Sequence, residues 1–262
     1  MSDFLFRVKD LKKTYDGQKF ILKGITIDIN PGEFIGVLGL SGAGKSTFLR
    51  CVNRLIDPSS GQIIFKKSFL TGNNNDKEEI DITQIKGNDL RLLRRKIGMV
   101  FQQFNIVKRL SVIDNVLSGS LGYQGTLKST LRMFSLEDKK LALANLERVG
   151  LLDQAYKRAD ALSGGQQQRV AIARTLMQKP SLILADEPVA SLDPKLSREV
   201  LSILKKVCQE DGISALVSLH TLELTKLYSD RIIGFQGGNL TFDGNAEQLN
   251  NEEIEKVYAR NN

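Results

Sequence analysis

A glycine-rich segment near the start of the chain has the residue types and spacing needed to hold a phosphate. Residues 39–46 read GLSGAGKS, which fits the pattern GxxxxGK followed by Ser or Thr. Glycines in such a loop let the backbone curl, so that successive N–H groups point at one phosphate. Lys45 would neutralise the β- and γ-phosphates, and Ser46 would offer its hydroxyl to Mg²⁺. We assign nucleotide binding to Gly39, Leu40, Ser41, Gly42, Ala43, Gly44, Lys45, Ser46 and Thr47.

Two adjacent acids end an apolar run later in the chain, where residues 182–187 read LILADE. A buried parallel strand that ends in acids would place them at the carboxyl edge of a sheet, where α/β proteins bind their ligands. We predict that Asp186 orients the Mg²⁺ shell. Glu187, which would point in another direction, is our candidate for the general base that polarises the attacking water. Taken alone, Glu187 could also be a solvated acid in the loop that follows.

Short apolar runs supply the strands that would position these residues. Phe34–Leu38, 182–185 and 213–219 are each typical of a strand buried on both faces. The first run leads directly into the glycine-rich segment, and a helix expected over 47–55 follows that segment. This order of strand, loop and helix is the setting in which a phosphate-binding loop works.

Helical patterns lie between the strands. Asp193 is expected to cap a helix that has Pro194 in its first turn and ends at Gly212. Residues 88–165 are mostly helical in pattern, and we predict that they form a helical subdomain inserted between two strand-rich regions. Because strands otherwise alternate with helices, the sequence predicts an α/β core with a largely parallel sheet.

Composition limits the class of protein without selecting a partner. The chain has 262 residues, of which 41% are hydrophobic, and a formal charge of +7. This charge would suit nucleotide phosphates, nucleic acid or an anionic lipid surface equally well. Cys51 and Cys208 lack CxxC spacing, so we expect two buried thiols in a reducing cytosol. No stretch approaches the roughly 18 apolar residues of a membrane span, so a membrane connection would go through other subunits. We expect residues 73–75 to form a loop.

The stretch from 162 to 169, which reads LSGGQQQR, discriminates between classes of phosphate-binding protein. Ser163 would open a helical run over 166–177 and present free N–H groups and a favourable dipole to a phosphate. A purely structural helix cap is the alternative for Ser163. LSGGQ resembles the signature motif of the ABC ATPase family, and the resemblance extends over 6–244.

The resemblance implies an architecture. The expected fold is a P-loop NTPase (RecA-like) α/β core with a mostly parallel sheet, an N-terminal antiparallel β region and the inserted helical subdomain at about 88–165. Residues 4–248 would form a single ABC ATPase domain, and 249–262 would be a short tail. No internal repeat suggests a second ATPase domain.

The resemblance also implies that the site is shared between two chains. A second, identical subunit would bind ATP and Mg²⁺, and the helix start of this chain would face the γ-phosphate of that ATP in a head-to-tail dimer. The residues implied on this side of the interface are Ser163, Gly164, Gly165 and Gln166. Asp193 would cross the same interface, in addition to capping its helix.

Three further positions match family motifs. Tyr15 is similar to the aromatic residue that stacks on adenine, and Gln102 to the residue that contacts Mg²⁺ and the attacking water. His220, the only histidine, is similar to the residue that hydrogen-bonds the γ-phosphate, because it follows a strand at the family's separation from Glu187. The implied catalytic set is Glu187, His220 and Gln102, and the implied Mg²⁺ set is Ser46, Gln102 and Asp186.

The implied function is that of the ATP-hydrolysing subunit of a membrane importer, peripheral at the cytoplasmic face of the inner membrane. Its partners would be transmembrane permease subunits and, indirectly, a substrate-binding protein. The chain is similar to importers of phosphonate, including relatives that carry phosphite, over residues 101–119, 158–160 and 188–194. The segment 66–87 differs, because it is longer and more polar than the corresponding segment expected in that subgroup.

Two alternatives stay open at this point. One is an ABC subunit for another cargo, such as phosphate, amino acids or lipoproteins. The other is a soluble ABC ATPase that works on nucleic acid, which the basic charge permits. The sequence lacks the long coiled-coil insertions or tandem ATPase halves of such proteins, so we expect no nucleic-acid partner.

Overall fold

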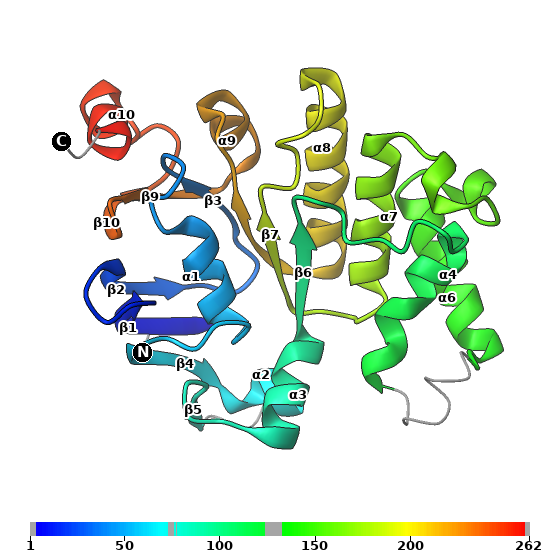
Figure 1. The fold of residues 1–262 in the computed structure, drawn as a ribbon, viewed down its shortest axis with the longest axis horizontal. Coiled ribbons are helices and arrows are strands. Elements are labelled where there is room, and N and C mark those ends of the chain that lie inside the picture. The colour runs from blue at the N-terminus through cyan, green and yellow to red at the C-terminus, as the bar shows by residue number, and fades with distance from the viewer. Residues whose placement is uncertain (1–3, 73–75, 77, 124–132, 260–262) are drawn as a thin grey trace.

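Two β-sheets and the helices around them form the framework of the chain (Figure 1). The computed structural model describes residues 4–72, 76, 78–123 and 133–259. The strands are β1 (Phe6–Thr14), β2 (Phe20–Ile29), β3 (Phe34–Leu38), β4 (Ser60–Lys66), β5 (Glu79–Asp81), β6 (Ile97–Phe101), β7 (Leu182–Asp186), β8 (Ser214–Ser218), β9 (Arg231–Gln236) and β10 (Asn239–Gly244). The α-helices are α1 (Lys45–Val52), α2 (Lys67–Thr71), α3 (Gly87–Lys96), α4 (Val112–Leu117), α6 (Leu136–Arg148), α7 (Gly164–Leu176), α8 (Pro194–Asp211), α9 (Leu222–Tyr228) and α10 (Asn251–Tyr258). Short 3₁₀ helices are η1 (Ser118–Tyr123), η2 (Leu152–Gln154) and η3 (Ala159–Ala161).

The larger sheet is mostly parallel. Its strand order is β10-β9-β3-β8-β7-β6, and only β10 pairs antiparallel with its neighbour. All residues of β3, β7 and β8 are buried, as expected when helices cover both faces of a parallel sheet. The strands predicted from the three apolar runs are therefore confirmed, as is the parallel α/β core.

Successive residues of the central strands face two different hydrophobic layers. Leu184 and Leu216 pack in the layer that contains Phe48 of α1. Their neighbours Ile183 and Ala215 pack in the layer that also contains residues of α7 and α8. Since side chains alternate along a strand, α1 covers one face of the sheet, and α7 lies with the layer on the other face.

The smaller sheet is antiparallel and has the order β2-β1-β4-β5. The Phe6 and Phe65 rings stack within it, with their centroids 4.9 Å apart. Both rings belong to the same buried layer as Phe48 of α1, so α1 is packed between the two sheets. The N-terminal antiparallel region expected from the sequence is confirmed.

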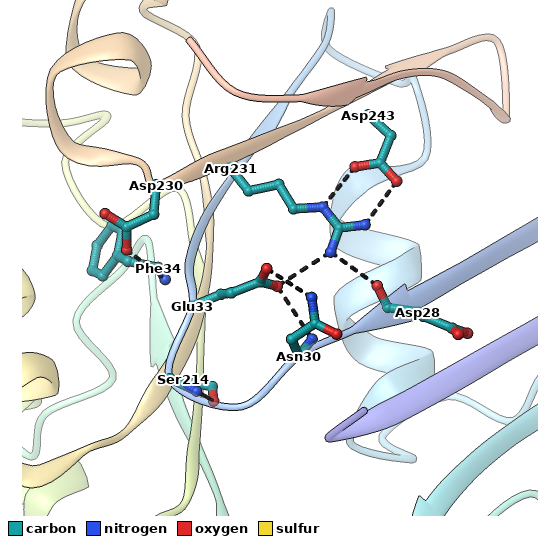
Figure 2. A network of polar contacts seen from close by, with 9 residues as sticks. Asp28, Asn30, Glu33, Phe34, Ser214, Asp230, Arg231 and Asp243 are labelled. Carbon is teal, nitrogen blue, oxygen red and sulfur yellow. Dashed lines mark hydrogen bonds and ion pairs between the residues drawn. The ribbon is translucent and has the colours of Figure 1, made fainter. Parts of the chain in front are cut away.

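A network of charged side chains ties the two sheets together (Figure 2). At the start of β9, the guanidinium of Arg231 donates to both carboxylate oxygens of Asp243 on β10, at 2.6 and 2.7 Å. Its third nitrogen donates to the backbone oxygen of Asp28 on β2 and to the carboxylate of Glu33, at 3.0 and 3.2 Å. Arg231 thus joins the end of the antiparallel sheet to the edge of the central sheet.

The helical subdomain expected over 88–165 differs from the structure in one respect. This range also contains β6, which belongs to the central sheet. It pairs with β7, so that Ile97 lies opposite Leu182 at one end and Phe101 lies opposite Asp186 at the other. The charged residues 94–96 continue the helical pattern of α3 to the first residue of β6. For this reason β6 could not be recognised in the sequence. The helices of this range therefore lie before the strand, as α3, and after it, as α4 and α6. Figure 1 shows the latter two beside α7 at one end of the molecule.

The expected C-terminal tail is also structured in part. Helix α10 packs against β9 and β10, and Val257 is completely buried. A Cβ atom added to Gly234 of β9 would collide with Cγ2 of Val257, so the helix sits close to the strand. Residues 249–259 are therefore part of the packed structure, which their short and polar sequence did not indicate.

Three smaller expectations concern the cysteines, membrane spans and one loop. Cys51 and Cys208 are buried free thiols, as predicted. Within the described ranges, the structure has no helix long and apolar enough to cross a membrane. The loop expected at 73–75 lies outside the described residues.

Candidate active site

The glycine-rich loop connects β3 to α1, and its glycines adopt conformations that other residues rarely adopt. Gly39, Gly42 and Gly44 have φ angles of 146°, 79° and 108°. A Cβ atom at Gly39 would collide with the backbone oxygen of Phe235, so a side chain cannot fit there. These left-handed conformations leave the backbone free to turn its N–H groups inward at the helix start.

Lys45 is held at the centre of this loop. Its Nζ donates to the backbone oxygens of Gly39 and Leu40, at 2.7 and 3.0 Å, and the residue is only 4% exposed. Burial lowers the pKa of Lys45, and the negative charges of Glu187 and Asp186 oppose that shift. Because an ammonium carries three donors, Lys45 can add a phosphate oxygen to these two carbonyl groups.

Ser46 and Asp186 bring two hard oxygen ligands together. The Ser46 hydroxyl donates to Oδ1 of Asp186 at 2.6 Å, and Nη2 of Arg50 lies 3.2 Å from Oδ2. Among the described residues there is no group of three or more His, Cys, Asp or Glu side chains that could hold a metal ion. Mg²⁺ suits such a pair nonetheless, since it takes one or two protein ligands and completes its shell with water and phosphate oxygens.

Glu187 follows Asp186 in a strained conformation. Its φ angle is 52°, and left-handed residues other than glycine are uncommon and concentrate at functional sites. Its backbone N–H donates to the Ser218 hydroxyl at 2.8 Å, and that hydroxyl donates to Asp186 at 3.3 Å. Nε2 of His220 lies 2.5 Å from Oε1 of Glu187. Contacts thus run without a break from Ser46 through Asp186 and Ser218 to Glu187 and His220.

Ser218 is a member of this chain that the sequence interpretation missed. It is the last residue of β8 and is fully buried. A serine that ends an otherwise apolar strand, two residues before a candidate histidine, was the available signal. Buried hydroxyls require hydrogen-bond partners, and the two acids at the end of β7 meet that requirement.

A cavity of about 310 Å³ opens beside Glu187 and His220. The starts of α8 and α9 form its other walls, where Pro194, Ser197 and Leu224 line it. The cavity gives the Glu187 carboxylate, which is 17% exposed, contact with a space large enough for water.

The predicted signature residues lie on a different helix. Ser163 caps α7: its hydroxyl accepts the N–H of Gln166 at 3.4 Å, and the Gln166 side chain accepts the N–H of Ser163 at 2.9 Å. Side chains at Gly164 and Gly165 would press on Leu192 and Leu196, respectively. The structural cap left open for Ser163 is therefore real, and it exists beside any role toward phosphate.

Three other predicted residues lie at separate places. Asp193 caps α8 as expected and accepts the N–H groups of Lys195 and Leu196, each at 3.0 Å. Tyr15 is 63% exposed, with Nζ of Lys13 5.0 Å from its ring centroid. Gln102 is exposed in the turn that follows β6. Among the described contacts, none links these three side chains to the cluster around Lys45.

Comparisons with known proteins identify the family. The profile of the ABC transporter family matches residues 22–190, which is more than half of the chain. The chain belongs to the ABC transporter family. A protein of Halalkalibacterium halodurans that is named phosphonates import ATP-binding protein PhnC 2 is 50% identical over 254 residues, which cover 97% of this chain and 99% of the relative.

Solved ABC transporter structures share the fold. The cbiO1 protein of Clostridium perfringens, part of the transporter complex cbiONQ, matches with a TM-score of 0.79 and 30% identity over 97% of this chain and 94% of its own. The ATP-binding cassette MJ0796, solved as a dimer bound to ADP and Pi, matches with a TM-score of 0.75 and 34% identity over 92% and 98%. The predicted family and fold class are thus confirmed, and the chain is an ATP-binding cassette.

Proposed function

We propose that this chain is the ATP-hydrolysing subunit of an importer and that it works as a head-to-tail dimer. The observation that carries the proposal is the continuous chain of contacts from Ser46 through Asp186, Ser218 and Glu187 to His220. It brings together the Ser46 hydroxyl, the Asp186 and Glu187 carboxylates and the His220 imidazole. Near the buried ammonium of Lys45, these side chains would act as a metal-binding pair, a general base and a hydrogen-bond donor. These are the parts that phosphoryl transfer to water requires.

Binding of ATP would rest on the loop between β3 and α1. Its backbone N–H groups and Lys45 would hold the phosphates, and Tyr15 would stack on the adenine ring. Ser46, Asp186 and Gln102 would hold Mg²⁺, which neutralises charge on the phosphates when it is bound.

Hydrolysis would begin with proton transfer from a water molecule to the carboxylate of Glu187. The oxygen of that water then bonds to the γ-phosphorus, and the bond between this phosphorus and the bridging oxygen of ADP breaks. Nε2 of His220 contacts the Glu187 carboxylate at 2.5 Å in the free chain and would donate to the γ-phosphate in its place when ATP is bound. The hydrogen bond from Glu187 N–H to Ser218 fixes the backbone that aims the base.

The second half of the site would come from another copy. Lys45 begins α1 and Ser163 caps α7, and these two helices pack in opposite layers of the central sheet. In a head-to-tail dimer, Ser163, Gly164, Gly165 and Gln166 of one chain would close on the ATP held by the other, with Asp193 at the same interface. We assign this unit to residues 4–248, with the helical subdomain inside 88–165 and α10 packed onto the core.

The test replaces the proposed base with its amide. Glu187→Gln keeps the shape of the side chain but cannot accept the proton, so we expect hydrolysis to slow by about 10²-fold or more. ATP binding should persist, and the variant should run as a dimer in gel filtration with Mg²⁺ and ATP. Glu210→Gln, a change of the same kind in the last turn of α8, serves as the control and should hydrolyse ATP normally.

Two results would overturn the assignment. Normal ATP hydrolysis by Glu187→Gln would remove Glu187 from the role of base. A monomer with bound ATP, at concentrations where the wild-type chain hydrolyses ATP, would contradict the shared site. Both measurements use the isolated chain and depend on no knowledge of its cargo.

The cargo we propose is phosphonate or phosphite. Its support is the 50% identity to a protein named for phosphonate import, which extends over nearly the whole length of both chains. Transmembrane permease subunits and, through them, a substrate-binding protein would be the partners at the cytoplasmic face of the membrane. ATPase activity of the reconstituted complex should rise with phosphonate or phosphite and not with phosphate, and a response to phosphate alone would reassign the cargo.

A further inference from the structure

The segment that follows Gln102 is attached to the last turn of α7. Nη1 of Arg174 donates to the backbone oxygen of Asn105 at 2.5 Å, and Nη2 donates to that of Phe104 at 3.1 Å. The guanidinium of Arg174 is partly withdrawn from water, and this burial lowers its pKa. A partly buried cation needs hydrogen-bond partners, and these two carbonyl groups supply them. A bidentate guanidinium is also more selective for geometry than an ammonium, because its donors are fixed in one plane.

The carbonyl groups that Arg174 binds belong to an unusual turn. Phe104 and Asn105 have φ angles of 55° and 49°, so two consecutive residues with side chains adopt the left-handed conformation. A bulky residue such as phenylalanine rarely does so, and strained residues persist only where surrounding contacts hold them. The two hydrogen bonds from Arg174 are contacts of that kind.

Phe104 also reaches the other end of α7. A Cβ atom built on Gly164 would lie 3.6 Å from Cζ of Phe104, which places the tip of the ring beside the first residue of the helix. Ser163, the cap of α7, directly precedes this glycine. The strained turn therefore lies beside the first residue of α7 through the Phe104 ring, and Arg174 binds it in the last turn of that helix.

We propose that Arg174 is a positioning residue that locks the turn after Gln102 onto α7, so that the two move as one unit and Ser163 keeps its orientation. The inference rests on the proposed function in one respect only, namely that Ser163 acts on ATP held by a second copy. Arg174 would act through Phe104 and Asn105, whose backbone oxygens it binds, and not on the reacting atoms. Loss of the lock would leave ATP binding at Lys45 unchanged and weaken the closure of the dimer.

The first experiment measures the lock in the free protein. Hydrogen–deuterium exchange in Arg174→Gln should be faster than in wild type at residues 102–106 and also at 163–166, because the turn would no longer hold the start of α7. Faster exchange confined to 102–106 would overturn the proposal, as would no change at either segment. This readout requires no ATP and no dimer, so its outcome is independent of the proposed function.

The second experiment measures the consequence for the dimer, in the Glu187→Gln background. With Arg174→Gln added, the affinity of the monomer for a fluorescent ATP analogue should stay within about twofold, whereas the dissociation constant of the ATP-bound dimer should rise about tenfold. Arg174→Lys should recover part of this loss, since it restores one donor. If Glu187→Gln itself fails to dimerise with ATP, the proposed function fails; if it dimerises and Arg174→Gln dimerises equally well, the lock fails.

Arg148→Gln is the matched control. Arg148 lies on α6 and is also partly buried, but its guanidinium binds Asp211, Glu210 and the backbone oxygen of Val207. This variant should lower the melting temperature without changing exchange at 163–166 or dimerisation. A general loosening of the helical region, rather than a lock, would give the same dimer defect in both variants and would overturn the proposal.

Discussion

Ser218 shows how one hydroxyl organises the ends of two strands. It receives the backbone N–H of Glu187 and donates to Asp186, so it supports both acids from β8. Ser218→Ala leaves the Glu187 N–H without this acceptor, and we expect a loss of about 1–2 kcal/mol in the free energy of unfolding. We also expect kcat for ATP hydrolysis to fall while KM stays unchanged.

The control for this prediction is Ser214→Ala. Ser214 is also buried, and its hydroxyl accepts the backbone N–H of Gly32 at 2.7 Å, at the opposite end of β8 from Ser218. It should lose stability in urea unfolding by a similar amount and keep its kcat. Equal effects of both variants on kcat would mean that Ser218 acts on stability alone.

The two cysteines give a prediction about pH. Burial raises the pKa of both Cys51 and Cys208 to about 12, so the neutral thiol is favoured in the folded state. At pH 8, a pKa of about 12 leaves a thiolate fraction on the order of 10⁻⁴ at each cysteine. Thiol reagents react with the thiolate and not with the neutral thiol. A thiol reagent should label neither residue in the native protein at pH 8 and both after unfolding. Rapid labelling of the native chain would show that α1, which contains Cys51, or α8, which contains Cys208, opens.

Most of the candidate site could be predicted from residue types alone. Lys45, Ser46, Asp186 and Glu187 stand at fixed places after apolar strands, and such places share one edge of a parallel sheet. Ser218 could not be found in this way, because its role depends on which strand lies beside β7. The positive φ angle of Glu187 was likewise hidden, since no glycine or asparagine announces it.

At the scale of elements, α10 is the part whose importance the sequence concealed. Val257 is its one completely buried residue and packs against β9. Val257→Ala should lower the free energy of unfolding by about 2 kcal/mol, because it removes two buried methyl groups and leaves a cavity. Urea denaturation measures this loss.

Lys256→Ala in the same helix is the comparison. Lys256 is exposed, and among the described residues its ion pairs are with Glu252 and Glu253 on its own helix, so its removal should have little effect. If Val257→Ala is as mild as Lys256→Ala, α10 does not contribute to the stability of the core. A marked difference between them would make residues 249–259 a structural part of the cassette.

Elements with clear end signals were predicted well, and those without such signals were not. Helix α8 begins at Asp193 and Pro194 and ends at Gly212, all of which the sequence marks. Strand β6 was missed because three charged residues of α3 lead straight into it without a glycine or proline between them. Its membership of the sheet depends on pairing with β7, which a local pattern does not reveal.

At the scale of the whole molecule, Arg231 connects the two sheets (Figure 2). Arg231→Met would leave Glu33 and Asp243 without their shared cation, and Asp28 would lose a donor to its backbone oxygen. Because Arg231 is partly exposed, we expect a loss of about 2 kcal/mol in the free energy of unfolding, less than for a fully buried pair. Denaturant titration provides the measurement.

Arg7→Met is the control for this network. Arg7 makes a bidentate pair with Asp28 inside the antiparallel sheet, so it bridges no two sheets. Arg7→Met should lower the free energy of unfolding by less than Arg231→Met does. Moderate salt should reduce the difference in free energy of unfolding between Arg7→Met and wild type. Equal losses would mean that the Arg231 network acts as an ordinary surface ion pair.

The placement of α1 and α7 with opposite layers of the central sheet has a kinetic consequence. If every turnover needs the Lys45 loop of one molecule and the Ser163 cap of another, the reaction is second order in protein while the chains are dilute. Diluting a stock tenfold would then reduce the rate about a hundredfold rather than tenfold. The cell would escape this penalty by mounting two copies on one scaffold, which keeps them at high local concentration.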